Sequence, residues 1–535
     1  MDLRLADWGS TLFRGCCWFV VAIPLLNGPV GAEVAPLPPI QAASGAGAGT
    51  VGSSLTDKLS RRAIECTAGL PSPARVKGVV FEPGHEMNPE PDTLQPVVRR
   101  PQGGYAMAAA TTMFTGGLFR GGTDILVAGL DNELVPRWAT VFGGPVSDLP
   151  VSITATRDGG VAAVSFTSSL WFSTVFRWLG KSEGAVLVSK YAPDGQLEWV
   201  QHLAVGGDPS GLSIVATPDG GILVGGGATR DGRFPGFLVH LSDAGQVRWA
   251  RQVGRDHEGT IAHLAVLPDG TVLASGSHRT ARASPRDVWV ARFDAQGGAV
   301  WARTYHGAAG GSTASVFALA DGGAIVIRSP EVERSRPGSR IAVFVIAPDG
   351  RVRWSRMLSF EERVTLSNFL EPSPGRLLLY GGSYLREDVA GPLVVELDAD
   401  GKLVDSRAVE IGSVAARPGM TMLASDQPIS VAPDGEGGLL LLGNLIAIPV
   451  DLVPLMNARS KLSDLDTPTR ARIRLQVFLL RLGAGTPAGP CTRAVPALAA
   501  DQRIEERVFE FPTSDLPADT VAPVPRIHLG VRSLR

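Results

Sequence analysis

The sequence predicts an all-β fold, a seven-bladed β-propeller, and three observations carry that prediction. Tryptophan recurs along the middle of the chain at intervals of 61, 50, 52 and 53 residues, at Trp138, Trp199, Trp249, Trp301 and Trp354. Each of the last four follows a glycine-containing turn and a short strand-like segment. Glycine and proline number 64 and 40 of 535 residues, against about 37 and about 27 at average usage. Because 44% of the chain is hydrophobic and can form a core, this excess predicts turns.

Each repeat also has a second turn midway, as in TPDGGILVGG at 217 and LPDGTVLASG at 267. Asp-Gly between β-patterned segments predicts a hairpin, since glycine accepts the positive φ of tight turns. A unit is therefore two hairpins, or four strands, and the turns near 102, 158, 219, 269, 321, 374 and 434 give seven units. Radial repetition lets each small sheet bury its faces against its neighbours. Eight blades, or two stacked sandwiches, are the alternatives.

This pattern of Asp-Gly-Gly, an apolar strand, Asp-Gly and then Trp resembles the bacterial secreted β-propeller repeats grouped with the quinoprotein-like propellers. The resemblance covers about residues 75–486 and implies the fold. Members of that group are largely uncharacterised, so it implies almost nothing about function.

The N-terminus predicts export. Residues 1–32 carry Arg4 and Arg14, an apolar run at 16–26, and small residues up to Ala32, which is the order of a signal peptide. The alternative, a membrane anchor, is disfavoured because 11 apolar residues fall short of the roughly 20 that span a bilayer. Residues 33–74 predict a flexible linker, and 75–490 the propeller. No other apolar run approaches membrane-spanning length, so we do not expect the chain to be an integral membrane protein after the signal peptide is cleaved. We expect the cleaved chain in the periplasm or outside the cell.

The last unit shows only three strands, ending at QVFLLRLGAG (476–485), while VKGVVFEPG (76–84) has no partner strands of its own. We expect residues 76–82 to pair antiparallel with 476–483 and to supply the missing strand of the last blade. That closure places Cys66 and Cys491 near the same seam, and a disulfide between them would persist in an exported chain. Two unpaired thiols are the alternative. The tail, 491–535, has scattered prolines and no sustained period, and we expect it to be mostly disordered.

In this arrangement all hairpins lie on one face, and the irregular loops at 168–183, 276–287, 328–340 and 445–475 lie on the other. Binding residues concentrate on loops of a rigid scaffold. The first loop is aromatic, with Trp171, Phe172 and Trp178, and either contacts a partner or caps the propeller's own channel. Ile448 and Leu455 add apolar groups in the last loop. An arginine cluster could hold carboxylate or phosphate, or could be solvated: Arg279, Arg282, Arg286, Arg334, Arg336 and Arg340.

No catalytic constellation stands out. The eight histidines lack metal-ligand spacing, no GxSxG or P-loop occurs, and DADGKLVD (398–405) reads as a hairpin turn instead of a calcium loop. We therefore expect no metal and no cofactor. A net charge of −2 offers no basic surface for phosphates, so nucleic acid is not expected as a partner.

The sequence favours an exported, non-catalytic binding or scaffold module with a protein or envelope-glycan partner. The alternative is a propeller enzyme, either a quinoprotein-like dehydrogenase or a carbohydrate-active hydrolase or lyase. Fold resemblance alone supports the alternative.

Overall fold

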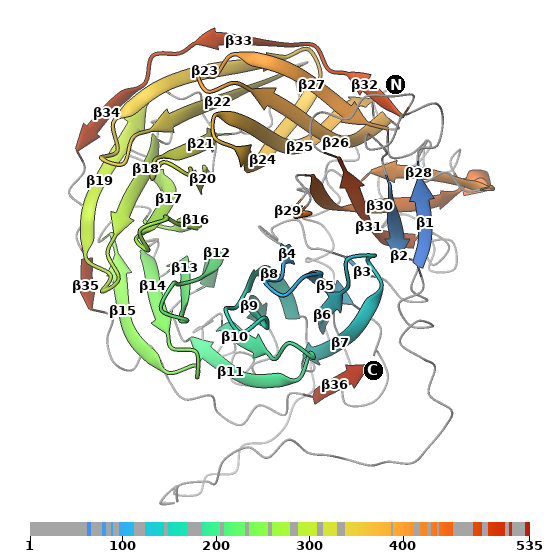
Figure 1. The fold of residues 1–535 in the computed structure, drawn as a ribbon, viewed down its shortest axis with the longest axis horizontal. Helices are drawn as coiled ribbons and strands as arrows, with labels where there is room; N and C mark the ends of the chain where they lie inside the picture. Colours follow the sequence, from blue (N-terminus) through green and yellow to red (C-terminus); the bar gives the residue numbers. More distant parts are fainter. Residues whose placement is uncertain are drawn as a thin grey trace, which may run out of the picture.

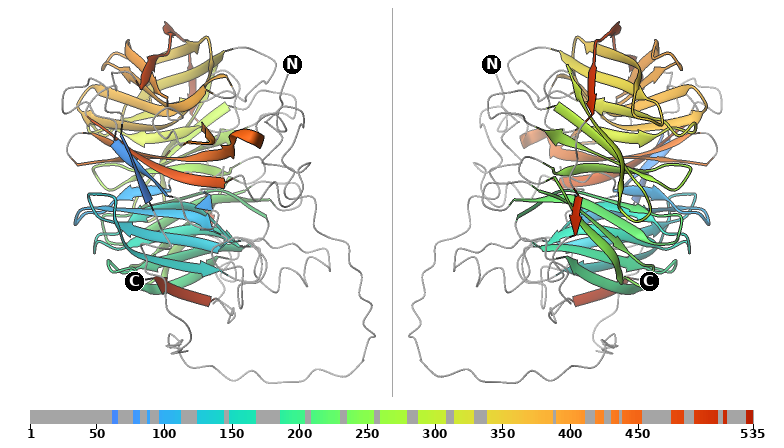
Figure 2. Two further views of the ribbon diagram at one scale, coloured as in Figure 1. Left: turned by 90° about the vertical axis from the view of Figure 1, so that its right-hand side faces the viewer. Right: turned by 90° about the vertical axis from the view of Figure 1, so that its left-hand side faces the viewer.

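The computed structural model is an all-β ring of seven small antiparallel sheets, here called blades 1 to 7 in chain order (Figure 1). Figure 2 shows the ring from the side, with the blades next to one another. The seven-bladed fold is confirmed, and the eight-bladed alternative is wrong. The structure describes residues 61–65, 77–81, 87–88, 96–111, 124–143, 148–167, 185–203, 208–229, 235–254, 259–278, 287–307, 314–328, 338–386, 389–410, 418–424, 430–435, 438–452, 474–483, 491–508, 513–515 and 530–534.

Blades 1 to 6 each use four consecutive strands, ordered from the ring centre outward. In blades 1 to 3 these are β4 (Val97–Arg99), β5 (Tyr105–Thr111), β6 (Asp124–Leu130) and β7 (Pro136–Gly143); β8 (Asp148–Ala155), β9 (Val161–Thr167), β10 (Ala185–Tyr191) and β11 (Leu197–Leu203); and β12 (Asp208–Ala216), β13 (Ile222–Thr229), β14 (Gly236–Leu241) and β15 (Val247–Val253). The short β3 (Met87–Asn88) extends the inner edge of blade 1.

Blades 4 to 6 repeat the same order. Their strands are β16 (Ile261–Val266), β17 (Val272–His278), β18 (Asp287–Phe293) and β19 (Ala299–His306); β20 (Ser315–Ala318), β21 (Ala324–Arg328), β22 (Ser339–Ile346) and β23 (Val352–Phe360); and β24 (Arg363–Ser373), β25 (Arg376–Arg386), β26 (Val389–Leu397) and β27 (Leu403–Val409).

Blade 7 joins both ends of the propeller. Its inner strands β28 (Met420–Ala424) and β29 (Ser430–Pro433) pair with β30 (Leu439–Pro449), which pairs with β31 (Arg474–Leu482). The next strand is β2 (Lys77–Phe81), antiparallel to β31 with Lys77 opposite Arg481 and Phe81 opposite Val477. The sequence predicts this antiparallel pairing of residues 76–82 with 476–483. Beyond β2 lies β1 (Arg61–Glu65), inside the segment expected to be linker. The only helical turn in the described residues is the 3-10 turn η2 (Val450–Leu452).

The core lies between blades. Side chains alternate along each strand, so Ala106 and Ala108 of β5 pack toward blade 2 while Met107 and Ala109 pack toward blade 7. Each of the seven junctions has its own cluster of buried apolar residues. A blade thus buries both faces, which explains why the repeat's inner strands are apolar almost throughout.

The recurring tryptophans fasten neighbouring blades. Each lies on the outermost strand, and its indole N–H donates to a carbonyl in the outer hairpin turn of the next blade, at 2.9–3.0 Å. The glycine of that turn lies against the indole ring: a Cβ on Gly195 would come within 2.4 Å of the Trp138 side chain. Gly195 has φ +85°, so two independent constraints require glycine there. We call this contact the clasp. It joins blades 1–2, 2–3, 3–4, 4–5 and 5–6.

The C-terminal segment was expected to be mostly disordered, and the structure instead places five short strands in it. Four add a fifth strand to the outer edges of blades 6, 5, 4 and 3, and the last adds to blade 1 (Figure 1). We call this segment the belt; its strands are β32 (Thr492–Ala494), β33 (Ala497–Asp501), β34 (Glu505–Val508), β35 (Thr513–Asp515) and β36 (Gly530–Leu534). Prolines such as Pro496 lie between the strands, where no ladder hydrogen bond is needed.

Buried and ionic contacts anchor the belt. Val495 is buried in the cluster between blades 5 and 6 and donates its N–H to Ser406. Arg493 donates two hydrogen bonds of 2.8 Å to the Glu362 carboxylate and one of 2.6 Å to Ser383. Because Glu362 is buried, this bidentate pair is stronger than an ordinary surface ion pair.

Candidate functional site

The two edges of the ring differ in regularity. Along one, the hairpin edge, the turns between first and second strands and between third and fourth strands repeat one hydrogen-bond pattern, as at Thr156–Gly160 and Ala192–Gln196, except for the shorter turn between Ser373 and Arg376 of blade 6. Along the other, the loop edge, the chain between second and third strands varies from 2 residues (387–388) to 24 (450–473). Sequence variation that the fold does not require is therefore concentrated on the loop edge.

Most predicted contact residues fall in those loops and lie outside the described residues: Trp171, Phe172, Trp178, Arg279, Arg282, Arg286, Arg334, Arg336 and Leu455. Arg340 is exposed on β22, which fits the solvated interpretation for that residue. Ile448 was expected in an exposed loop, and this is wrong: it is buried in β30, paired with Thr421 of β28. The second strand of blade 7, β30, continues to Pro449, so the connection to the third strand begins with η2 at Val450.

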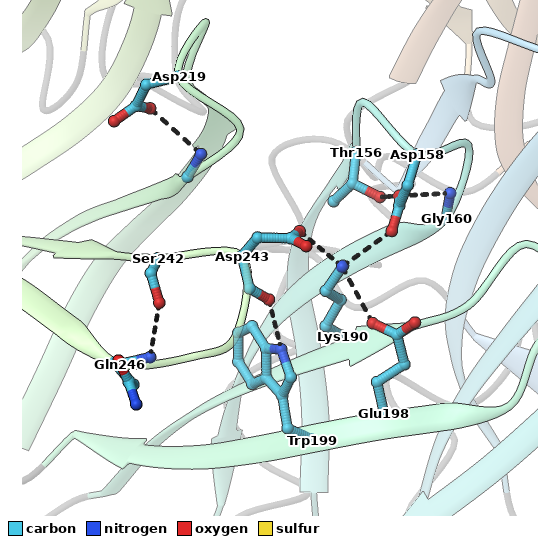
Figure 3. A network of polar contacts seen from close by, with 11 residues as sticks. Thr156, Asp158, Gly160, Lys190, Glu198, Trp199, Asp219, Ser242, Asp243 and Gln246 are labelled. Atoms are coloured by element: carbon cyan, nitrogen blue, oxygen red, sulfur yellow. Dashed lines mark hydrogen bonds and ion pairs between the residues drawn. The ribbon is translucent and has the colours of Figure 1, made fainter.

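The hairpin edge carries a row of ion pairs, and Lys190 of β10 is at its most buried point (Figure 3). Its Nζ lies 2.8 Å from Asp158, 3.0 Å from Glu198 and 2.6 Å from Asp243, the last in blade 3. Burial alone would lower the pKa of Lys190, but the hydrogen bonds with the three carboxylates outweigh it and raise that pKa. Asp243 also accepts the clasp bond from Trp199 at its backbone oxygen, so one residue ties blade 3 to blade 2 twice.

The following blades repeat this pairing with arginine. Asp219, Asp269 and Asp321, each in the first turn of its blade, bind Arg248, Arg292 and Arg353. Each aspartate also accepts a backbone N–H two residues ahead, which fixes the turn. These charges stabilise hairpins, so the carboxylates of the hairpin edge are already bound within the fold.

At the loop edge, two buried aspartates approach each other where blades 1 and 2 meet. Asp124 begins β6 opposite Thr111, and Asp148 begins β8 opposite Thr167. Both are almost fully buried, at 2% and 0% exposed. Burial, together with the neighbouring charge of Asp148, raises the pKa of Asp124 to about 7. Such a pair holds a proton near neutral pH.

A second polar group lies at the loop edge of blade 4. His306 Nδ1 is 2.8 Å from Asp287, and its Nε2 is 3.1 Å from the Thr304 hydroxyl. Thr304 is 4% exposed. Asp287 is the first residue of β18 and lies near the buried Arg328. Burial lowers the pKa of Arg328, and the negative charge of Asp287 opposes that shift. Because Thr304 is buried, its hydroxyl is not an accessible nucleophile. Thr304 and Asp287 instead hold the His306 ring in place at the end of β19.

Cys491 is partly buried beside the cluster between blades 6 and 7, and its carbonyl accepts the Glu410 N–H at 2.9 Å. Cys66 lies outside the described residues. Glu65 is opposite Lys77, which is opposite Arg481, so both predicted partners follow strands that end at one edge of blade 7. The Cys66–Cys491 disulfide stays a prediction.

Within the described residues, no group of three or more His, Cys, Asp or Glu side chains could hold a metal ion. The same residues contain no helix long and apolar enough to cross a membrane.

Comparisons with known proteins add little. No protein-family model matches the chain, and no curated protein matches it by sequence. Among solved structures, a glycoside hydrolase of family 32 from Bifidobacterium adolescentis is similar over 78% of this chain and 81% of that one, at 11% identity and a TM-score of 0.24. At that TM-score the likeness carries no argument about activity.

Proposed function

We propose that this β-propeller is an exported, non-catalytic binding or scaffold module that contacts a protein or envelope glycan through its loop edge. The observation that supports this is the contrast between the edges. The hairpin edge uses its charged side chains internally, in the Lys190 network and the aspartate–arginine pairs. The loop edge carries connections of 2 to 24 residues that the fold does not require. Binding residues are concentrated on the loops of rigid scaffolds.

The test is co-sedimentation of the purified mature protein with isolated cell envelopes and with peptidoglycan. One variant replaces Trp171, Phe172 and Trp178 by serine. A matched control replaces three exposed apolar residues of the outer strands, Val247, Val300 and Val404, by serine. The control should sediment like the wild type, while the loop variant should stay in the supernatant with a melting temperature within a few degrees.

Equal sedimentation of the folded loop variant contradicts a contact through the aromatic loop. If the loop variant unfolds, its aromatics are core and cap the ring. Replacement of Arg279, Arg282, Arg334 and Arg336 by glutamine then tests the other part of this edge. Loss of binding only after removal of envelope proteins distinguishes a protein partner from a glycan.

The alternative, an enzyme, draws no support from the Asp124–Asp148 pair. These side chains are 2% and 0% exposed, so a glycan cannot reach them for general acid–base work.

A further inference from the structure

The belt meets blades 6, 5, 4 and 3 at a constant interval. The residue three positions after the tryptophan, or after Asp405 in blade 6, marks the same place on each outer strand. At these places Arg493 pairs with Ala408, Ala500 with Met357, Arg507 with Thr304, and Ser514 with Gln252. The belt residues are 7, 7 and 7 apart. Seven extended residues span at most about 23–25 Å, so one heptad of chain covers one blade.

The residues that connect the belt strands contact the ring at the same seven-residue interval. Val495 donates its N–H to Ser406, and Gln502, seven residues later, donates its N–H to Ser355, the equivalent residue of the next blade. Gln502 also donates its side-chain amide to Gly307 of blade 4 at 2.6 Å. From Ser514 to Arg532, which pairs with Val141 in blade 1, the belt uses 18 residues for two blades, so the interval holds only for blades 3 to 6.

The outer strands of the ring differ in sequence between the blades where the seven-residue interval holds and those where it does not. Two residues after each tryptophan, or after Asp405, blades 3 to 6 have arginine: Arg251, Arg303, Arg356 and Arg407. Blades 1 and 2 have Thr140 and Gln201 at that position. Arg356 binds Asp501 of the belt at 2.6 Å, and Arg303 lies 3.8 Å from Glu506, whose other oxygen accepts the Val352 N–H. An arginine row therefore accompanies the regular part of the belt.

These arginines are held by the ring itself. Arg356 donates to the carbonyls of Ser355 and Asp400 and lies over the Trp354 ring. Arg251 makes the equivalent contacts with Ala250, Gln296 and the Trp249 ring. Contacts of this kind hold the guanidinium groups in place before any carboxylate arrives, which lowers the entropic cost of binding. The rim is thus a preorganised surface on which each blade offers an outer strand that pairs with the belt, and one cation.

We propose that the outer rim of blades 3 to 6 is a docking surface for an extended segment with a seven-residue interval and with carboxylates at the places of Asp501 and Glu506, and that a second copy's belt can occupy it in place of the chain's own. A second copy fits because its belt has the same interval and the same acidic residues, whereas an arbitrary tail need not. Exchange of identical strands is a low-cost route between monomer and dimer. Within one chain the belt acts at an effective concentration on the order of 1 mM, which keeps exchange rare at low protein concentration.

The experiment uses the full mature chain and a fluorescent peptide of residues 492–508, which stands in for a second copy's belt. Arg493→Gln in the chain removes the pair with Glu362, whereas the peptide keeps its arginine. The peptide should bind this variant at least about tenfold more tightly than wild type. Adding Arg303→Gln and Arg356→Gln to that variant should abolish the gain. A peptide with one glycine inserted after Gln502 shifts the interval to eight and should also lose it.

At high concentration the Arg493→Gln chain should form more dimer than wild type in sedimentation velocity, and unlabelled peptide should dissolve that dimer. Equal binding of the normal and the shifted peptides overturns the proposal, as does a folded Arg493→Gln chain that binds neither. If that variant does not fold, wild type is titrated with both peptides to 1 mM. Preference for the normal peptide supports the docking surface, and its absence contradicts it.

Discussion

Five junctions between blades carry a tryptophan clasp, while the two junctions that flank blade 7 have other contacts. In the clasped junctions an indole N–H reaches the outer hairpin of the next blade. Blade 7 has no such hairpin, because its strand β2 comes from the other end of the propeller. Blade 6 accordingly has Asp405 in place of tryptophan, and Asp405 binds Arg407 of its own strand at 3.0 Å. The tryptophan recurs only where the fold gives it an acceptor.

The junction from blade 7 to blade 1 differs in a second way. The outer hairpin of blade 1 has Leu134 where the clasped turns have glycine, at φ +61°, and no other described residue besides glycine has positive φ. Leu134 is 4% exposed and belongs to the cluster between blades 7 and 1. Arg481 donates to Asn132 in that turn, the position at which Pro193 accepts from Trp138. A leucine side chain thus fills the space that an indole fills elsewhere.

The largest expected effect is at the seam. Deleting residues 60–85 removes β1 and β2, which leaves β31 with an unpaired edge and opens the apolar cluster that contains Val79 and Phe81. We expect loss of cooperative thermal unfolding, measured by circular dichroism and calorimetry. Deleting residues 495–535 is the comparison: it removes most of the belt, and should lower the melting temperature without preventing folding. A chain starting at Met87 that melts like the mature protein would show that the ring does not need this strand.

Exchanging the turn residues sharpens the comparison. Gly195→Leu forces a side chain into positive φ and against the Trp138 ring, at a cost of about 2–5 kcal/mol. Leu134→Gly relieves its φ but empties a buried site, at a cost of about 2–4 kcal/mol. Urea unfolding of both variants measures these costs. A neutral Gly195→Leu would mean that the indole does not lie on that turn in solution.

A smaller effect is expected from the clasp hydrogen bond. Trp301→Phe keeps an aromatic ring but removes the bond to Pro348, and should cost about 1–2 kcal/mol. Asp405→Trp restores the repeat residue where no outer hairpin follows, and should give no stabilisation. If Asp405→Trp stabilises the protein by as much as Trp301→Phe destabilises it, the indole ring contributes through packing and does not need a carbonyl acceptor in the next blade. Chemical denaturation at one pH provides both numbers.

The last predicted effect concerns pH, at the loop end of the clasped junction between blades 1 and 2. Asp124 has a folded pKa of about 7, above its ordinary value of 3.8, so the folded state keeps a proton that the unfolded state releases. The contribution of Asp124 to the free energy of unfolding therefore decreases as pH rises from about 4 to 7, and is constant above that window. Asp124→Asn should flatten this part of the profile relative to wild type. Identical profiles from pH 4 to 8 would contradict the raised pKa.

Much of the fold was predictable because turn chemistry and the tryptophan interval are local. Asp-Gly turns mark the hairpins, and the broken series at Asp405 marks the seam. The belt was not predictable in the same way, because an edge strand half exposed to water has no apolar alternation: Ala499, Ala500 and Asp501 resemble a loop. Its signal was in the ring, where arginine follows the tryptophan by two residues in blades 3 to 5.

The polar groups were harder to predict. Lys190 inside the apolar strand AVLVSKY was a visible signal, since a lysine there needs carboxylate partners. Asp124 and Asp148 gave none, because an aspartate at the start of a strand is usually solvated. Only the junction of blades 1 and 2 buries them together. The aromatic and arginine loops remain predictions.

The most direct test of ring closure is a disulfide engineered across the seam. Lys77 and Arg481 are directly opposite on β2 and β31, which puts their Cα atoms about 4.5–5.5 Å apart, within the range of a disulfide. The control moves one cysteine two residues along, to Leu479, out of register. Peptide mapping without reduction should show a Cys–Cys link within one chain for Lys77→Cys with Arg481→Cys, and little for the control. Two free thiols in the folded, oxidised protein would contradict closure of the ring by its N-terminal strand.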